Sequence, residues 1–432
     1  MPRQNIFFLV LVLLFGLFAA SRLSPPDRVL LEALRLVERD ALEPVEEEEL
    51  IEGALDGMLS RSPYYPYSAY LPPDEEEAYE EEIQGTFAGI GIGHMAVDEA
   101  SGELWFTPIY GSPAWNAGLR FGERITAIGG EKIDGRSPED IHEILFGDLD
   151  EPVLLSVRSR GDVLRRYGGE EPESAEAVRE VEIRRAMVQL DIVAGYRRAG
   201  DGSWIYTLDG KPSVGYVRID QFTDETVPLF EEALKKLDED GVTSLIIDLR
   251  GNPGGFLEGA AGLCSSFLPK GAEVVTIRGR GGEVQKRITA DGRKKYGWKL
   301  AVLIDEESAS ASEIVAGALA DHHRAALVGT RSYGKGTVQE LSTLPLEMGM
   351  IRLTCASFNR PSGKSIHRAA GAADDDTWGV SPAGENRIEL DNYQRGAVIL
   401  LADRRSLPAD GESLSGPMTR LIFDRARKMD LI

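Results

Sequence analysis

Residues 299–329, KLAVLIDEESASASEIVAGALADHHRAALVG, hold an apolar run, a serine-rich turn, a run of small and apolar residues and a second short apolar run. These runs are typical of a buried strand, a helix and another strand. Three serines stand at alternate positions, 308, 310 and 312, where the first strand gives way to the helix. Serine favours the first turn of a helix, because its hydroxyl can bond the free backbone N–H groups there. Capping alone, however, needs only one serine.

The neighbouring sequence repeats this alternation of strand and helix. Residues 213–219 and 243–250 predict strands, and 224–241 and 255–267 predict helices. Near-continuous apolar strands that alternate with helices indicate a layered α/β core. We therefore predict a multidomain protein of the α/β (α+β) class.

The rest of the chain divides by its composition. Short β-like runs from Gly85 onward predict a small β-rich domain, which holds one helical run and a polar stretch from Gly161 to Ala177 that we expect to be an extended hairpin loop. Two amphipathic helices are predicted before it, and a helical segment follows the core. The predicted domains are 1–26, a signal peptide or membrane anchor; 27–84, helical; 85–187, β-rich; 188–390, the α/β core; and 391–432, helical.

The composition is that of a globular protein. The 432 residues are 42% hydrophobic and 28% charged, with a formal net charge of −23, so the chain carries an acidic surface. This charge argues against nucleic acid as a partner. Cys264 and Cys355 each lie in an apolar stretch, and we interpret both as buried, with a disulfide left open.

The N-terminus predicts export. An apolar run from Ile6 to Ala20 follows a single arginine, which is short for a membrane span and suits a signal peptide. Ala19, Ala20 and Ser21 offer a small-residue cleavage site, and an uncleaved anchor is the other possibility. We expect an exported protein in the periplasm or cell envelope of a bacterium, anchored to the inner membrane if the segment is retained.

A strand-turn-helix crossover suits Ser310 as a nucleophile, because the first turn of the helix aims free N–H groups outward. Its base is less obvious. The histidines at 322 and 323 lie about three turns further along, and those at 94 and 142 belong to the β-rich domain. His367 lies in a polar stretch, so we expect it at the surface, and a role as base stays open as the alternative.

A lysine can replace histidine if burial lowers its pKa. Lys335 lies between two glycines that allow close packing, and Gln339 offers a carbonyl oxygen that could orient its amine.

Residues 329–336, GTRSYGKG, also match the phosphate-loop pattern. Gly336 stands where that pattern needs Ser or Thr, and a strand with a proline follows in place of a helix, so we disfavour nucleotide binding.

The stretch 308–339, SASASEIVAGALADHHRAALVGTRSYGKGTVQ, closely resembles the signature of the C-terminal processing peptidases, which are serine endopeptidases with a Ser-Lys dyad. The lysine stands 25 positions after the serine, as in that family. The resemblance implies that Ser310 is the nucleophile, Lys335 the base and Gln339 its orienting partner. Ser308 and Ser312 then become supporting residues.

The resemblance extends to two further segments. Residues 245–260, LIIDLRGNPGGFLEGA, are similar to the family's strand and turn, which implies an oxyanion hole of the Gly255 and Ala311 N–H groups; a plain Pro-Gly-Gly turn is the alternative. The β-rich domain resembles a PDZ domain, which binds a peptide's C-terminus as an added strand. Its carboxylate-binding loop is then Gly89, Ile90, Gly91 and Ile92. Glu123, where the family usually has aspartate, and the 161–177 insertion depart from the pattern.

The implied activity is endopeptidase cleavage of proteins near their C-termini, with no cofactor and no metal. The partners expected are protein or peptide substrates bound by their C-termini, the membrane through an uncleaved N-terminus, and a second copy of the chain. Two alternatives remain: a catalytically silent PDZ scaffold that binds peptides, and a Ser-Lys amidase or esterase that acts on small molecules.

Overall fold

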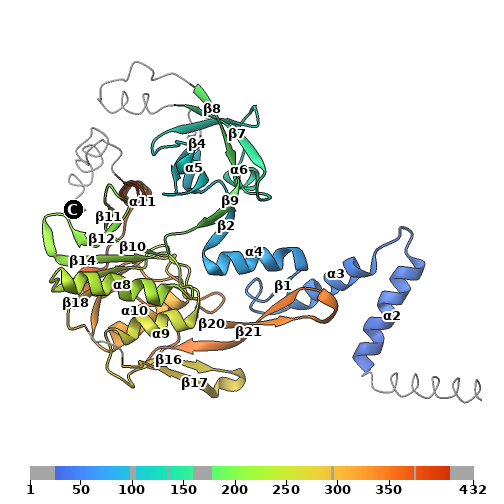
Figure 1. Ribbon diagram of the computed structural model, residues 1–432. Helices are drawn as coiled ribbons and strands as arrows, with labels where there is room; N and C mark the ends of the chain where they lie inside the picture. Colours follow the sequence, from blue (N-terminus) through green and yellow to red (C-terminus); the bar gives the residue numbers. More distant parts are fainter. Residues whose placement is uncertain are drawn as a thin grey trace, which may run out of the picture. The chain divides into compact units, whose positions relative to one another are not determined.

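The computed structural model describes residues 25–97, 104–133, 136–158, 178–292, 296–373 and 376–408 (Figure 1). Its contacts divide the chain into two compact units, Met1–Glu76 with Gln339–Thr354, and Glu77–Val338 with Cys355–Ile432. The predicted α/β core included 339–354, which these contacts group with the N-terminal helices; the domain boundaries stay a prediction. The predicted signal segment up to residue 24, the 161–177 insertion and residues 409–432 lie outside the described residues.

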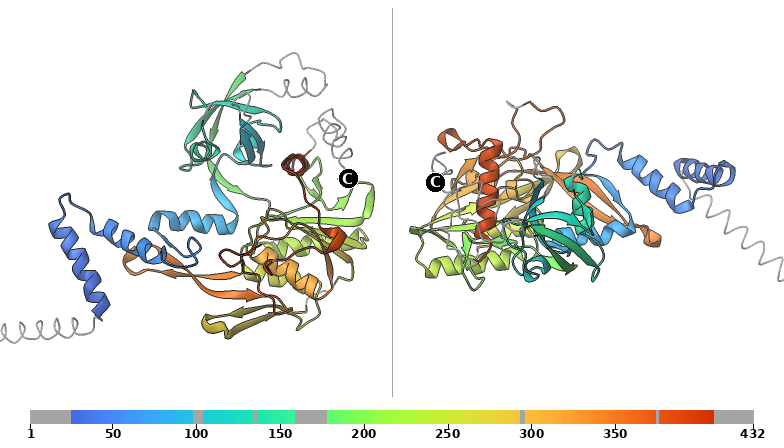
Figure 2. Two further views of the ribbon diagram at one scale, coloured as in Figure 1. Left: turned by 180° about the vertical axis from the view of Figure 1, so that it is seen from behind. Right: turned by 90° about the horizontal axis from the view of Figure 1, so that it is seen from above.

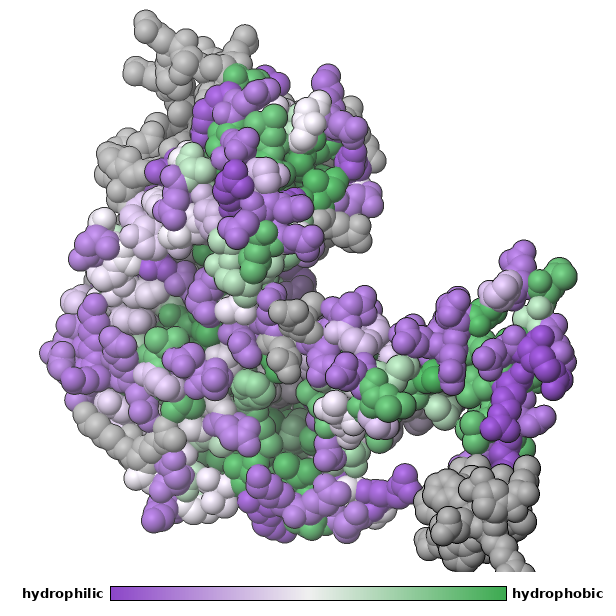
Figure 3. Space-filling view, turned by 45° about the vertical axis from the view of Figure 1, so that its right-hand side comes forward, coloured by the Kyte–Doolittle hydropathy of each residue, from purple (hydrophilic) through white to green (hydrophobic). Residues whose placement is uncertain are grey.

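The first unit consists of helices and short strands. It contains α2 (Pro25–Asp40), α3 (Glu47–Leu59) and β1 (Ala69–Leu71), together with most of β20 (Thr337–Thr343) and the first half of β21 (Met350–Asn359). β1 pairs antiparallel with β21, with Leu71 opposite Met350. Large apolar side chains of α2 are exposed, among them Val29, Leu30 and Leu36 (Figure 3). In the described part of the chain, no helix has the length and apolar character needed to span a membrane.

The α/β core of the second unit is built on a mostly parallel sheet. Its order is β10-β14-β15-β18-β19, with β13 paired to β14. The helices α8, α9 and α10 pack on one face and bury the strands' alternate apolar residues, such as Val217, Ile247 and Val302 (Figure 1). The parallel pairing of β14, β15, β18 and β19 is what the near-continuous apolar runs predict, although these three helices cover one face of the sheet only. The bounds are β10 (Val193–Ala194), β13 (Thr207–Leu208), β14 (Lys211–Ile219), α8 (Thr226–Glu239), β15 (Ser244–Asp248), α9 (Leu257–Ser265), β18 (Lys299–Ile304), α10 (Ala311–Asp321) and β19 (Ala325–Gly329).

Further elements surround this core. The strand β16 pairs with β17 and with the second half of β21, and the helix α11 lies beside the β11-β12 hairpin (Figures 1 and 2). Cys264 is buried as predicted, and burial raises the pKa of its thiol. Cys355 is only partly buried, because its side of β21 is partly open, so that prediction is wrong; the two cysteines do not form a disulfide. The bounds are β11 (Arg197–Arg198), β12 (Trp204–Ile205), β16 (Glu273–Arg278), η1 (Arg280–Gly282), β17 (Val284–Thr289), η2 (Pro345–Glu347), η3 (Gly384–Asn386) and α11 (Asn392–Arg405).

The β-rich part forms its own sheet and hydrophobic core. The strand order is β3-β4-β5-β7-β8, with β6 paired to β5, and β3 is an edge strand. A separate antiparallel pair, β2 and β9, runs between this sheet and the core (Figure 2). The bounds are α4 (Pro73–Gln84), β2 (Thr86–Gly89), β3 (Ile92–Val97), β4 (Leu104–Pro108), α5 (Pro113–Asn116), β5 (Arg124–Ile128), β6 (Glu131–Lys132), α6 (Pro138–Leu145), β7 (Pro152–Arg158), β8 (Val178–Arg184) and β9 (Ala186–Gln189).

The unusual Glu123 has a structural role in this domain. Its buried carboxylate accepts the Arg120 backbone N–H at 2.9 Å and two bonds from the Arg179 guanidinium, at 2.7 and 3.0 Å. Paired bonds of this kind between a guanidinium and a carboxylate are strong and directional. The glutamate therefore ties the turn before β5 to β8.

Candidate active site

Ser310 lies at the end of the turn between β18 and α10. Its backbone has φ 54° and ψ −113°, a conformation that residues with a side chain rarely adopt, and Ala311 begins the helix. The side chain is partly exposed, whereas the serines on either side are buried. Strained residues of this kind persist where the surroundings hold them and are concentrated at functional sites. Of the three serines, the backbone therefore leaves only Ser310 accessible to a substrate.

The two flanking serines hold the turn in place. The Ser308 hydroxyl donates to the Leu249 carbonyl at 2.8 Å, and the Ser312 hydroxyl donates to the Asn252 carbonyl at 3.1 Å. Both acceptors belong to the segment after β15. The Ala309 N–H also donates to the Asn252 carbonyl, at 3.0 Å. Ser308 and Ser312 thus bond the serine turn to the loop that holds the Pro-Gly-Gly sequence.

This glycine turn packs directly against the serine. Gly254 and Gly255 have φ values of 107° and 130°, which favour glycine. A Cβ on Gly254 would come within 2.7 Å of the Ser310 Cβ and 3.0 Å of the Ala311 nitrogen. A Cβ on Gly255 would lie 2.0 Å from the Phe222 carbonyl oxygen. The glycine turn therefore packs against Ser310 and Ala311, and the oxyanion role of Gly255 and Ala311 stays a prediction.

Glu313 connects the serine turn to the lysine loop, a role that our reading of the sequence missed. Its carboxylate is fully buried. Oε2 accepts the backbone N–H groups of Ser310, at 2.9 Å, and Lys335, at 2.8 Å. Oε1 accepts the Ser332 hydroxyl at 2.5 Å and the Gly334 N–H at 2.7 Å. The available signal was Ser-x-x-Glu at a helix start, the capping-box pattern.

Lys335 is thereby placed beside Ser310, because both backbone nitrogens bond the same carboxylate oxygen. Its side chain is partly buried. The loop that carries it follows β19 and is followed by β20, so the phosphate-loop pattern has no helix after it. Gln339 is placed on β20 in the first unit, where its Nε2 donates to Thr354 Oγ1 at 3.2 Å. Its orienting role stays a prediction.

Of the candidate histidines, only the His367 backbone lies against the lysine loop in the described contacts. His322 ends α10, and its Nε2 contacts the Glu273 carbonyl at 2.7 Å. His94 and His142 lie on the β-rich sheet and its helix α6, as predicted. The His367 backbone lies against Gly336, next to the lysine loop, and burial lowers the pKa of its imidazole. His367 is thus half-buried, and its role stays a prediction.

The predicted carboxylate-binding loop, Gly89–Ile92, joins β2 to β3. The Gly91 carbonyl accepts the Ile109 N–H at 2.9 Å. A trans peptide points its carbonyl and the next N–H in opposite directions, so the Ile92 N–H points away from β4. Because β3 is the edge strand of its sheet, this N–H lies on the open edge, as an added peptide strand requires.

The pH dependence of this site is expected to follow Glu313. Burial raises the pKa of Glu313 to about 7, from 4.5, although the bonds from Ser332, Gly334, Ser310 and Lys335 oppose the rise. Because the folded pKa is the higher one, Glu313 favours the fold below pH 4.5, and this contribution is lost as pH rises to about 7. The carboxylate accepts four donors only when ionised, so activity should rise over the same range.

Thermal unfolding and initial rates from pH 4 to 9 check this expectation. Unfolding is best measured on Ser310→Ala, which removes self-cleavage. Activity that is already maximal below pH 5 would contradict the role given to Glu313.

Comparison with known proteins identifies the fold and the class of the protein. Residues 213–377 match Peptidase family S41, and residues 107–159 match the PDZ domain. A solved S41 protease from Bacteroides fragilis shares the fold, with a TM-score of 0.50 and 18% identity, over 80% of this chain and 83% of that one. The fold and the serine turn thus define a PDZ-containing serine-type peptidase.

Relatives that match over most of this chain specify the family within this class. The chain is 34% identical over 327 residues to the carboxy-terminal-processing protease of Bartonella bacilliformis, covering 74% of this chain and 68% of that protein. It is 32% identical over 343 residues to the carboxy-terminal processing protease CtpB of Bacillus subtilis, covering 78% and 65%. The chain belongs to the carboxy-terminal processing protease family, and it spans about two thirds of the length of these relatives.

Proposed function

We propose that the protein is an endopeptidase that cleaves polypeptides near their C-termini, using a Ser310-Lys335 dyad and a PDZ domain that docks the substrate's tail. The observation that carries the dyad is the shared Glu313 oxygen, which bonds the backbone of both residues. A nucleophile and its base must lie within hydrogen-bond reach during the reaction. The Glu313 bridge holds their two backbones close together, which supports this pairing.

The proposed reaction is acyl transfer. The uncharged Lys335 amine takes the Ser310 hydroxyl proton as Oγ attacks the scissile carbonyl carbon, and the ammonium then protonates the leaving amine. The Gly255 and Ala311 N–H groups stabilise the oxyanion, each worth about 3 kcal/mol in the barrier. Water, deprotonated by Lys335, releases the acyl group and restores the serine.

Tail docking is supported by the open edge of β3 and by the glycine loop before it. A substrate tail would add as a strand to β3, with its carboxylate on the N–H groups of Gly89–Ile92. The domain would thus select chains by their free C-termini. We further propose that the protein is exported to a bacterial envelope, with or without a retained N-terminal anchor, and cleaves its substrates there.

One experiment tests both parts. A reporter protein with an apolar tail is incubated with the wild-type chain or with Ser310→Ala, and mass spectrometry maps the new carboxyl ends. The same reporter with an amidated C-terminus is the matched control, because it lacks the carboxylate. We expect cleavage only with Ser310, and at least about tenfold slower cleavage of the amidated reporter. Cleavage by Ser310→Ala would refute the nucleophile, and equal rates on both reporters would refute tail docking.

A further inference from the structure

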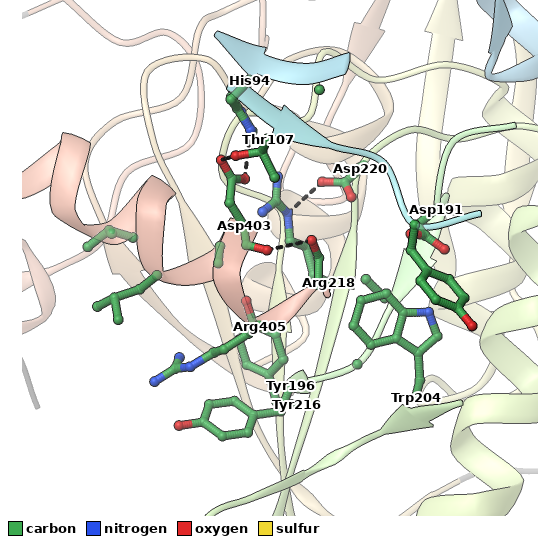
Figure 4. Close-up of a pocket in the computed structure, with 18 of the residues that line it drawn as sticks. His94, Thr107, Asp191, Tyr196, Trp204, Tyr216, Arg218, Asp220, Asp403 and Arg405 are labelled. Carbon is green, nitrogen blue, oxygen red and sulfur yellow. Dashed lines mark hydrogen bonds and ion pairs between the residues drawn. The ribbon is translucent and has the colours of Figure 1, made fainter. Parts of the chain in front are cut away.

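A buried carboxylate on α11 contacts the PDZ sheet. Asp403 is only 6% exposed. Its carboxylate accepts His94 Nδ1 at 2.8 Å and the Thr107 hydroxyl at 2.9 Å (Figure 4). His94 lies on β3 and Thr107 on β4, some three hundred positions before Asp403 in the chain. These contacts tie the C-terminal helix to the two strands nearest the tail-binding edge.

The same helix is fastened to the peptidase core. Arg198 Nε donates to the Ser406 carbonyl, just after α11, at 2.7 Å, and its Nη2 bonds both carboxylate oxygens of Asp191. The Arg405 guanidinium lies 4.2 Å from the centre of the Tyr196 ring. Since α11 is held on the core at its end and on the PDZ sheet at Asp403, it bridges the two.

One aromatic contact also joins the two parts: the Tyr110 ring, just after β4, lies 4.6 Å from the Arg198 guanidinium and packs against Gly202 of the core. A cavity of about 500 Å³ lies between the PDZ strands, α11 and the face of the core sheet opposite its helices. Tyr216 and Arg218 of the sheet are among its lining residues (Figure 4). The chain enters and leaves the PDZ domain through the β2-β9 pair, and two-stranded ribbons are only marginally stable on their own. Beyond this ribbon, the Asp403 contacts and the Tyr110 packing hold the domain on the core.

We propose that Asp403 is a positioning residue, which holds the PDZ domain on the core through His94 and Thr107 so that a docked tail leads its substrate to Ser310. This inference rests on the proposed tail docking. The strand β3 carries both His94 and the edge to which the tail would add. Fixing β3 thus fixes the path of the bound chain, whereas peptides without a tail reach Ser310 independently.

The charges around His94 support an ion pair at this contact. The hydrogen bond to Asp403 raises the pKa of His94; Asp220 also raises it, while burial and Arg218 lower it. Arg218 and Asp220 form their own ion pair at 2.5 Å on the core side of the cavity (Figure 4). Because the folded pKa of His94 is raised, the contact is strongest below pH 6.5 and weakens as pH rises through that pKa.

The test removes both donors and then restores one. His94→Leu with Thr107→Val leaves the Asp403 carboxylate without these bonds, and neither change enlarges a core side chain. His94→Asn keeps an N–H donor near the Nδ1 position and does not titrate. Each variant is assayed on the tailed reporter and on a short peptide without a tail, and its affinity for a free tail peptide is measured by fluorescence anisotropy.

For the double variant, we expect kcat on the tailed reporter to fall about tenfold, with the short-peptide rate and the tail affinity within about twofold of wild type. His94→Asn should keep the rate on the tailed reporter well above that of the double variant, and this rate should no longer show the pH dependence that His94 causes. An unchanged rate on the tailed reporter, or an equal fall on both substrates, would overturn the proposal.

Hydrogen exchange separates this inference from the proposed function. In a Ser310→Ala background, amides of residues 392–405 should exchange faster in the double variant than in its parent. Unchanged exchange would refute the contact even if the protease proposal holds. Conversely, faster exchange in a chain that never cleaves a reporter would preserve the contact and refute the activity.

Discussion

Replacing Lys335 with alanine is expected to lower kcat by at least about 10⁴-fold, because Ser310 loses the group that takes its proton. Lys335→Arg should be equally inactive. A guanidinium keeps the charge and the donors but cannot be deprotonated in a protein, so it cannot serve as a base. Steady-state hydrolysis of a tailed reporter measures both variants.

The matched control is Lys364→Ala, an exposed lysine on a nearby loop, which should keep wild-type rates. The Ser310→Ala/Lys335→Ala double variant should be no slower than either single variant, since residues that act as a unit are not additive. Substantial activity in Lys335→Arg would exclude a lysine base and direct attention to His367, whose backbone lies against the same loop.

Glu313→Gln is expected to reduce kcat by about 10²-fold or more and to destabilise the fold by about 2–4 kcal/mol. A glutamine has one acceptor oxygen, so two of the four donors now bonded to Glu313 would face an NH₂ group. The backbones of Ser310 and Lys335 would then lose their common anchor. Stopped-time assays and chemical denaturation measure the two effects.

Glu307→Gln provides the control, because this exposed glutamate lies in the same turn, three residues before the serine. It should change neither rate nor stability by a measurable amount. If Glu313→Gln unfolded at the wild-type denaturant concentration and kept its rate, the carboxylate would be a passive cap and not the link between the two segments.

Much of the fold follows from the pattern of the sequence. The strands and helices around Ser310 were predictable from two patterns. Near-continuous apolar runs are typical of buried strands, and apolar residues at helical spacing are typical of a helix that buries one face. The serine turn was also apparent, since three serines exceed what capping needs. Glu313 was missed for a physical reason: an acidic residue at a helix start is usually a solvated cap, and only the folded chain shows that this one is buried.

The sequence by itself determined the class of protein, because the residue types and spacing of the serine, glycine and lysine segments are local properties of the chain. It could not determine which distant segments meet. The bonds from Ser308 and Ser312 to the loop after β15, the shared Glu313 oxygen, and the contact of Asp403 with His94 all join residues that only packing brings together. Such contacts depend on burial and hydrogen-bond geometry in three dimensions, which no local pattern encodes.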